Sequence, residues 1–295
     1  MLKILRQSLR TGIVTNSFPH DVAEPPNGFR GKPVIDFARC TACDRCSAAC
    51  PTTAISIRTG NDNVAANERN EKIVSLNYGD CIFCGECEAV CPESVHLSKE
   101  FQLASTNKSD LTTQARYTVG RDGVFAFAGM ISEQPSNDQS VEETGKALKE
   151  KIAILFGRSL HIREVDAGSC NGCEVEISAL NNPVYDIERF GVHFVASPRH
   201  ADMLLVTGPV TRNMEVALRQ TYDATPNPKL VVAVGACAIG GGIFGQSYAS
   251  CGGVDTVLPV DVYIPGCPPR PEALLHGILQ AINQIPQKTQ SKQYA

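Results

Sequence analysis

A cysteine motif that occurs twice constrains this chain more than any other feature of its sequence. Residues 40–51 read CTACDRCSAACP and residues 81–92 read CIFCGECEAVCP, so the spacing C-x2-C-x2-C-x3-C-P returns after 41 residues. An apolar alternation follows each copy, at residues 55–57 and 95–97, which is typical of a short strand. The repeat predicts two similar units, each with tight cysteine turns, a short helix and a strand.

The spacing is that of the bacterial iron–sulfur run, in which the fourth cysteine binds the neighbouring cluster. We therefore predict two 4Fe-4S clusters that exchange their fourth ligands. The first cluster takes Cys40, Cys43, Cys46 and Cys91, and the second takes Cys81, Cys84, Cys87 and Cys50. Zinc also binds thiolates in C-x2-C pairs, so two zinc sites are the alternative. Zinc sites rarely use the triple run followed by proline, which occurs twice here.

The other cysteines are spread over the rest of the chain. Of 13 cysteines in 295 residues, five lie outside the repeat: Cys170, Cys173, Cys237, Cys251 and Cys267. The odd total argues against a purely disulfide-paired monomer, and the length suggests two domains. The formal net charge is −4, without the basic excess typical of a nucleic-acid-binding protein. We therefore expect no nucleic-acid partner.

Apolar β-type runs alternate with helix-like stretches in the second half of the chain. The predicted strands are residues 152–156, 192–196, 203–207, 230–234 and 260–264. The predicted helices are residues 174–180, 213–222 and 271–282. Continuous apolar strands between helices indicate a doubly wound parallel sheet, in which ligands bind beyond the carboxyl ends of the strands.

Two of the late cysteines, Cys237 and Cys267, are predicted to lie at that edge of the sheet, and Cys170 and Cys173 are candidates to join them. Cys170 and Cys173 open a helix in GSCNGCE, whereas Cys237 and Cys267 each follow a predicted strand. Four thiolates there would hold a third cluster. From spacing alone, a zinc site or a redox-active dithiol remains open for the pair, and a buried role for the single cysteines. We interpret Cys251 as a small loop residue.

The chain divides into five predicted sections. They are an N-terminal docking arm (1–35), a two-cluster domain (36–104), a linker (105–150), a second domain (151–285) and a flexible tail (286–295). Leucines at helical spacing in residues 1–13 alternate with bases, which indicates a short helix. That helix either packs on its own domain or docks against a partner subunit or a membrane surface.

Two further patterns bear on location. The bases of the N-terminal segment interrupt the apolar core that a secretory signal needs. Residues 230–254 carry no charge but include seven glycines, so we interpret them as a buried strand and a glycine-rich loop, not a membrane span. We expect a cytoplasmic protein, in which clustered cysteines indicate metal or catalysis.

Both halves resemble known families. The segment GFRGKP (28–33) and the second cysteine run carry the first resemblance. By these segments, the first third of the chain resembles two-cluster bacterial ferredoxins and the polyferredoxin-type subunit of formate hydrogenlyase. Residues 152–282 resemble the small subunit shared by nickel–iron hydrogenases and respiratory complex I, on DAGSCNGCE, YDIERFG, SPRHADMLLVTGPVT, GACAIGGGIF and PVDVYIPGCPPRPEALLHGIL. The resemblance implies an α+β ferredoxin-like two-cluster domain followed by an α/β flavodoxin-like doubly wound domain.

The same resemblance assigns site residues. The family's proximal 4Fe-4S ligands match Cys170, Cys173, Cys237 and Cys267, which implies a third cluster. Complex I relatives carry adjacent cysteines at the first pair, so the C-x2-C spacing here favours the energy-converting, membrane-bound hydrogenase branch. The resemblance makes Glu174 a candidate proton relay; the alternative is an acid that interacts with the helix dipole. Three histidines are expected to be hydrogen-bonded or surface residues: His161, His193 and His200.

The implied function is electron transfer in a membrane-bound nickel–iron hydrogenase complex that resembles formate hydrogenlyase. Three 4Fe-4S clusters would relay electrons to or from an active site in a hydrogenase-type large subunit, with catalytic residues outside this chain. The implied partners also include an iron–sulfur or formate dehydrogenase donor subunit and membrane subunits, which would place the chain on the inner face of the cell membrane.

Cofactors other than iron–sulfur clusters are not expected in this chain. The sequence lacks a dinucleotide-binding fingerprint, so NAD is not expected, nor is flavin. Nickel is not expected because only Cys251 remains once three clusters are filled. Two other functions stay open: a complex I-like or hydrogenase-related oxidoreductase that reduces quinone or another acceptor, and a zinc-stabilised scaffold.

Overall fold

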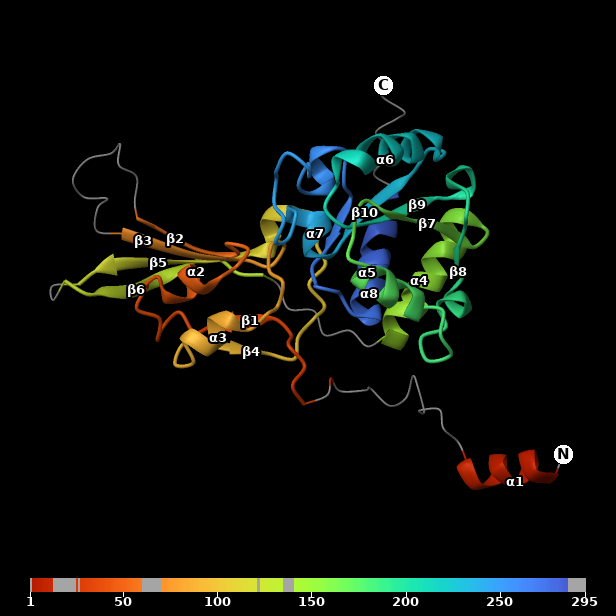
Figure 1. Cartoon of the computed structure of the whole chain (residues 1–295), viewed down its shortest axis with the longest axis horizontal. Coiled ribbons are helices and arrows are strands. Elements are labelled where there is room, and N and C mark those ends of the chain that lie inside the picture. Colours follow the sequence, from red (N-terminus) through yellow and green to blue (C-terminus); the bar gives the residue numbers. More distant parts are fainter. Residues whose placement is uncertain are drawn as a thin grey trace.

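The chain folds into two units that lie side by side (Figure 1). The structure is a computed structural model that describes residues 2–12, 25, 27–59, 71–120, 123–134 and 141–285. The first unit contains the repeated cysteine motif and two small sheets, and the second is built around a parallel sheet. The predicted tail, 286–295, lies outside the described residues.

The two cysteine runs form matching halves of the first unit. Each run leads into a one-turn helix, α2 (Arg45–Ala49) in the first copy and α3 (Glu86–Val90) in the second. Strand β1 (Pro33–Ile35) pairs antiparallel with β4 (Val95–Leu97). The predicted docking arm, 1–35, therefore ends too late, because its last residues pair with β4 and belong to the first unit.

A four-stranded antiparallel sheet completes the first unit. Its order is β2-β3-β5-β6, with β2 (Ile55–Thr59), β3 (Glu71–Asn77), β5 (Thr112–Val119) and β6 (Phe125–Ser132). The prediction of a linker over 105–150 was wrong for this stretch. Thr113, Ala115 and Tyr117 are buried at every second position of β5, so a period-2 pattern exists within a polar-looking segment.

The second unit has a five-stranded sheet in which every pair of neighbours is parallel. Its order is β11-β10-β9-β7-β8. The strands are β7 (Leu160–Asp166), β8 (Val192–Phe194), β9 (Met203–Thr207), β10 (Leu230–Val234) and β11 (Val262–Ile264). Every residue of β9 and β10 is buried, since helices cover both faces of the sheet. The parallel sheet predicted from the sequence is present.

Helices from different parts of the chain cover the two faces. One core contains residues of α4 (Val141–Phe156), α5 (Gly172–Ala179) and α8 (Pro271–Ile282), and the other contains residues of α6 (Arg212–Ala224) and α7 (Gly235–Gly240). Short 3-10 turns connect the elements: η2 (Lys108–Leu111), η3 (Ile187–Phe190), η4 (Pro198–His200) and η5 (Val254–Thr256). The predicted glycine-rich loop after β10 thus begins as the helical turn α7.

One predicted strand was wrong. Residues 152–156 form the last turn of α4, and β7, which the prediction missed, is the first strand of the sheet. Leu148 and Ile152 are buried four residues apart, whereas Ile154 is 81% exposed, which is helical periodicity. A short apolar run such as IAILF fits a strand or a buried helix equally well, because neither period is visible over five residues.

The N-terminal helix α1 (Leu2–Thr11) stands away from both units (Figure 1), and none of its side chains is buried against the described residues. Its leucines and bases are exposed, so it does not pack on its own domain in this structure. Among the described residues, no helix is both long and apolar enough to cross a membrane.

Candidate functional site

The structure gathers the first predicted set of cysteines. Ala42 and Asp44 have positive φ values of 51° and 65°, which bend the chain between successive cysteines of the motif. This turn lets the Ala42 N–H donate to Cys40 Sγ at 3.4 Å. Burial, and then the nearby thiols of Cys40 and Cys91, together raise the pKa of Cys46 to about 11. The fourth cysteine of the second motif therefore lies beside the first three.

Arg45 contacts this first set. Its Nε donates to Cys43 Sγ at 3.4 Å and its Nη2 lies 3.9 Å from Cys91 Sγ, while its guanidinium also pairs with Glu93. These hydrogen bonds lower the pKa of Cys43 to about 7. Sequence reasoning missed Arg45, although a basic residue inside a cysteine run is a signal for contact with thiolates.

The second set repeats this geometry after 41 residues. Phe83 and Gly85 have positive φ values of 55° and 85°, and the Phe83 N–H donates to Cys81 Sγ at 3.4 Å. Burial is the main cause that raises the pKa of Cys81 to about 12. The Phe83 hydrogen bond opposes the rise, and the thiols of Cys87, Cys50 and Cys84 contribute to it. Cys50, from the first motif, is thus a neighbour of the second set.

The third set assembles at the carboxyl edge of the parallel sheet. The loop after β7 carries Cys170 and leads into α5, Cys237 lies on α7 directly after β10, and Cys267 follows β11. Burial raises the pKa of Cys173, and among its neighbours Glu174, Cys237, Cys267 and Cys170 raise it further. Four residues separated by up to 97 positions in the sequence therefore lie together. The predicted strand edges indicated this position for Cys237 and Cys267, whereas β7, the strand before Cys170, was not predicted.

The donor chemistry of each set suits an iron–sulfur cluster. Each set offers four thiols, and thiolates are the ligands of 4Fe-4S clusters. Glycines leave open space beside the sulfurs of the third set, since a Cβ at Gly242 would lie 2.7 Å from Cys237 Sγ. Within the described ranges, no three His, Cys, Asp or Glu side chains are grouped so as to hold a single metal ion. Ligation by the three sets stays a prediction.

Glu174 directly follows Cys173 of the third set and lies beside the end of β9, the middle strand of the parallel sheet. Its Oε1 accepts a hydrogen bond from Thr207 Oγ1, at the end of β9. Its Oε2 is buried and has no hydrogen-bond partner in the part of the chain that the structure describes. Burial and then the Glu174 charge raise the pKa of Glu164. The carboxyl group of Glu174 thus interacts with that of Glu164, which lies within β7.

Cys251 lies apart from the three sets. It is buried, and its Sγ donates to Glu215 Oε2 at 3.3 Å. The predicted histidines are also remote from the cysteines: His161 Nδ1 lies 3.2 Å from His200 O, and His193 pairs with Glu188 at 3.6 Å. The structure assigns none of these residues to the cysteine-rich edge.

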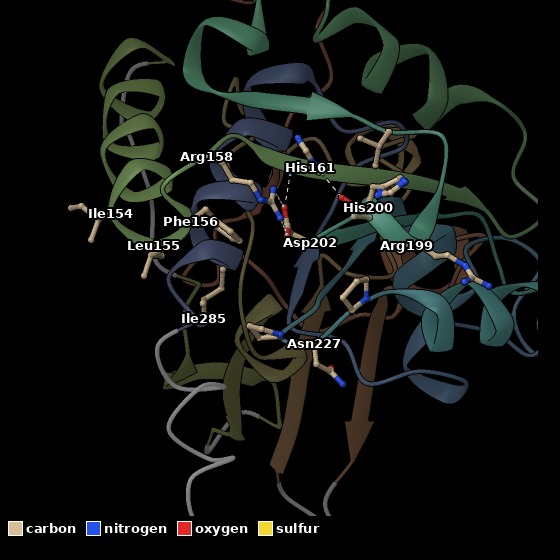
Figure 2. A pocket seen from close by; sticks show the side chains of 14 residues that line it. Ile154, Leu155, Phe156, Arg158, His161, Arg199, His200, Asp202, Asn227 and Ile285 are labelled. Carbon is tan, nitrogen blue, oxygen red and sulfur yellow. Dashed lines mark hydrogen bonds and ion pairs between the residues drawn. The ribbon is translucent and has the colours of Figure 1, made fainter.

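A large cavity opens at the opposite end of the parallel sheet (Figure 2). It has a volume of about 1150 Å³, and its lining includes residues that precede or begin three strands, namely His161, Asp202 and Asn227. Arg158 forms two hydrogen bonds with Asp202 there, at 2.9 and 2.7 Å. The cavity is therefore separate from the cysteine sets, which follow the strands.

The two units meet beside the cysteines. Ser105 and Tyr263 exchange two backbone hydrogen bonds, and Lys108 Nζ lies 2.8 Å from Asp255 Oδ2. A second cavity, of about 600 Å³, lies between the units and is lined by Cys84 of the second set and Cys267 of the third. The second and third sets therefore face the same space.

Comparisons with known proteins cover both units. Residues 28–95 match the 4Fe-4S dicluster domain, and residues 170–281 match the family NADH ubiquinone oxidoreductase, 20 Kd subunit. The probable membrane-bound hydrogenase subunit mbhJ of Pyrococcus furiosus is 51% identical over 143 residues, which cover 48% of this chain and 86% of that protein. The chain belongs to this 20 Kd subunit family. The family resemblance expected from the sequence is thus confirmed.

Further members of the 20 Kd subunit family differ in the complexes that their names state. Formate hydrogenlyase subunit 7 of Escherichia coli is 45% identical over 153 residues, which cover 52% of this chain and 60% of that protein. An NADH-quinone oxidoreductase subunit of Bacteroides thetaiotaomicron is 54% identical over 134 residues, which cover 45% of this chain and 67% of that protein. Hydrogenase-type and quinone-reductase-type relatives are therefore both similar to the second unit.

Proposed function

We propose that this chain is the electron-transfer iron–sulfur subunit of a membrane-bound nickel–iron hydrogenase complex of the formate hydrogenlyase type. The observation that carries the proposal is the arrangement of three four-cysteine sets in a row. The first two sets exchange Cys50 and Cys91, and the second and third face one cavity through Cys84 and Cys267. A row of sites from one unit to the other is the arrangement that an electron relay needs.

Each set would hold one 4Fe-4S cluster, for a total of three. A bound cluster takes up and releases single electrons at a potential that its surroundings determine. The chain supplies four thiolates per cluster, backbone N–H groups such as that of Ala42 aimed at the sulfurs, and burial. Hydrogen bonds and burial of this kind tune the potential, which is the protein's part in such chemistry.

Glu174 is the candidate proton relay of the proposal. Its buried Oε2 lacks a hydrogen-bond partner among the described residues, and its charge reaches Glu164. A carboxyl group in this position can take up a proton and pass it on without breaking a second hydrogen bond of its own. The active site that uses the proton would lie in a partner large subunit.

The proposed partners are a hydrogenase-type large subunit, an iron–sulfur or formate dehydrogenase donor subunit and membrane subunits. The relatives are named as subunits of membrane-bound hydrogenase, formate hydrogenlyase and NADH-quinone oxidoreductase, which supports a peripheral subunit of a membrane complex. The inner face of the cell membrane is the side that we propose for it. The strand order, which is 2-1-3-4-5 when the five strands are counted along the chain, supports the flavodoxin-like part of the fold assignment.

A second candidate function rests on the match to the NADH-quinone oxidoreductase relative from Bacteroides thetaiotaomicron. In that case a complex I-like or hydrogenase-related complex would reduce quinone or another acceptor. The three cysteine sets would serve both functions, since they carry electrons in either case. The acceptor therefore has to be determined on the assembled complex.

Metal analysis of the anaerobically purified chain tests the proposal. Three clusters require about twelve iron atoms and about twelve acid-labile sulfides per chain. Zinc without iron would overturn the proposal in favour of a scaffold. Hydrogen evolution from reduced viologen by the intact, nickel-loaded complex then separates the two redox functions, because a quinone-reducing complex evolves no hydrogen.

A further inference from the structure

The cavity between the two units is built around the second and third cysteine sets. Cys84 and Cys267 line it together with Arg30 and Arg270. Arg30 donates through Nη1 to Cys84 O at 2.7 Å, and so ties the segment before β1 to the turn of the second set. The position of this segment therefore affects the position of Cys84.

Arg270 reaches from the second unit to the first. It lies three residues after Cys267, and its guanidinium carbon is 5.1 Å from the ring centroids of both Phe29 and Phe101. The two rings are perpendicular to each other, at 89° and 6.0 Å. A guanidinium is planar and weakly hydrated, so it stacks well on aromatic faces. One cation thus contacts two rings of the neighbouring unit.

The orientation of Arg270 is fixed from its own side. Its Nε and Nη2 each lie 3.2 Å from one carboxylate oxygen of Glu272, a residue that is 8% exposed. The Tyr185 hydroxyl donates to Glu272 Oε1 at 3.1 Å and holds the carboxylate. The guanidinium is therefore held by a carboxylate of the second unit and by two rings of the first.

The two rings are themselves held together by the backbone. A Cβ at Gly31 would lie 2.5 Å from Ser98 O, so only glycine permits this close approach. The Lys32 N–H donates to Glu100 O at 2.7 Å. These contacts place Phe29, before β1, beside Phe101, after β4. The stacking surface for Arg270 is thus carried by the backbone of the first unit, and Phe101 also packs against the core of the second.

We propose that Arg270 is a positioning residue for electron transfer between the second and third cysteine sets. By stacking on Phe29 and Phe101, it keeps Cys84 and Cys267 at the same cavity. The inference rests on the proposed function. One electron leaves one site, which is oxidised, and enters the other, which is reduced; no bond forms or breaks and no proton moves.

Other contacts between the units act elsewhere. The Ser105–Tyr263 bridge and the Lys108–Asp255 pair hold the units together, but none of these four residues lines the cavity. Arg270 joins the units at the cavity itself. Its loss should therefore change the spacing at this junction more than it changes the stability of the whole chain.

The test is the Arg270→Lys variant in the cluster-loaded complex. Lysine keeps the charge but loses the planar stack and the two-point contact with Glu272. We expect a weaker magnetic interaction between the second and third clusters in the electron paramagnetic resonance spectrum, at unchanged iron content. Backbone hydrogen exchange at residues 28–32 of the full chain should rise roughly tenfold, since a desolvated cation–π contact is lost.

Arg158→Lys is the matched control. Arg158 also pairs with a carboxylate, that of Asp202, and lies 5.9 Å from the Phe156 ring, but at the opposite end of the sheet (Figure 2). The Arg158→Lys variant should leave the magnetic interaction between the clusters and the backbone hydrogen exchange at residues 28–32 unchanged. Phe101→Leu, which removes one ring from the other side, should reproduce the effect of Arg270→Lys and add little to it in the double variant.

The outcomes separate the two proposals. A wild-type chain that binds no iron–sulfur cluster overturns the proposed function and, with it, the role in electron transfer. Intact clusters with wild-type magnetic interaction and wild-type exchange in both Arg270→Lys and Phe101→Leu overturn the role of Arg270 alone. An equally weakened magnetic interaction in Arg158→Lys would also overturn the role of Arg270, because the effect would then not be specific to the junction.

Discussion

A Cβ atom at Gly235 would lie 2.7 Å from the Sγ of Cys173, closer than side-chain atoms approach one another. Gly235 also has a φ of 86°, in the region that favours glycine. It follows β10 directly and begins α7, which carries Cys237. The glycine therefore lets the chain turn beside one thiol of the third set while it positions another.

The Gly235→Ala variant should lose the third cluster and keep the other two. The added methyl group would displace the Cys173 sulfur, so iron should fall from about twelve to about eight atoms per chain. Gly157→Ala is the control, since Gly157 has a φ of 60° but no atom within 4 Å of its added Cβ. Because of backbone strain, Gly157→Ala should lower the free energy of unfolding by roughly 1–3 kcal/mol. It should keep all of its iron. Equal iron in the two variants would contradict the crowding argument.

Cys267→Ser should remove one thiolate of the third set without disturbing the first unit. After anaerobic reconstitution, we expect the variant to lack about four iron atoms per chain and one set of electron paramagnetic resonance signals. Cys251→Ser is the matched control, because Cys251 is buried and contacts Glu215 rather than another cysteine. Loss of iron from Cys251→Ser would show that the assignment of the third set is incomplete.

Glu174→Gln should slow hydrogen evolution by about a hundredfold at unchanged iron content, because glutamine cannot carry the proton. The amide can still accept the hydrogen bond from Thr207, so the local structure should persist. Glu188→Gln, at an exposed carboxylate that pairs with His193 away from the cysteines, serves as the control and should retain activity. Equal rates for the Glu174→Gln and wild-type complexes would exclude Glu174 from the proton path.

Arg45→Gln should make the first cluster harder to reduce. The guanidinium contacts Cys43 and Cys91, and a positive charge beside the thiolates favours the more negative, reduced state. We expect the reduction potential of the first cluster to fall by roughly 30–60 mV, which is up to a tenfold change in a one-electron equilibrium. A redox titration monitored by electron paramagnetic resonance measures this shift.

Arg39→Gln controls for the loss of a nearby charge. Arg39 is 74% exposed and pairs with Asp36, so solvent screens its charge and the potential should stay within experimental error. An equal shift in both variants would mean that net charge, rather than the contact with the sulfurs, determines the potential.

Elements with a clear sequence signal were predicted well. The helix predicted over 271–282 matches α8, because Pro271 marks its first turn and its apolar positions recur with helical period. The strands at 203–207 and 230–234 match β9 and β10, because a run buried on both faces stays apolar throughout.

The failures share a physical cause. Residues 152–156 were wrongly predicted as a strand because the burial of Ile152 depends on helix α8 of a distant segment, which five apolar letters do not reveal. Residues 112–119 were assigned to a linker because β5 is polar on one side, and only pairing with β3 shows that its other side is buried. Both errors concern partners that lie far away in the sequence.

The sequence by itself determined the local chemistry: where the turns of the cysteine motifs fall, that the motif repeats, and which residues follow strands β10 and β11 of the parallel sheet. Such features depend on neighbours in the chain, so spacing reveals them. Only the tertiary structure decided that Arg45 contacts Cys91 and that Arg270 stacks on Phe29 and Phe101. It also decided that Cys84 and Cys267, 183 positions apart, share one cavity. The contact of Arg45 with Cys91 depends on how the two halves of the first unit pack, and the other relationships depend on how the two units pack. The order of residues along the chain encodes neither locally.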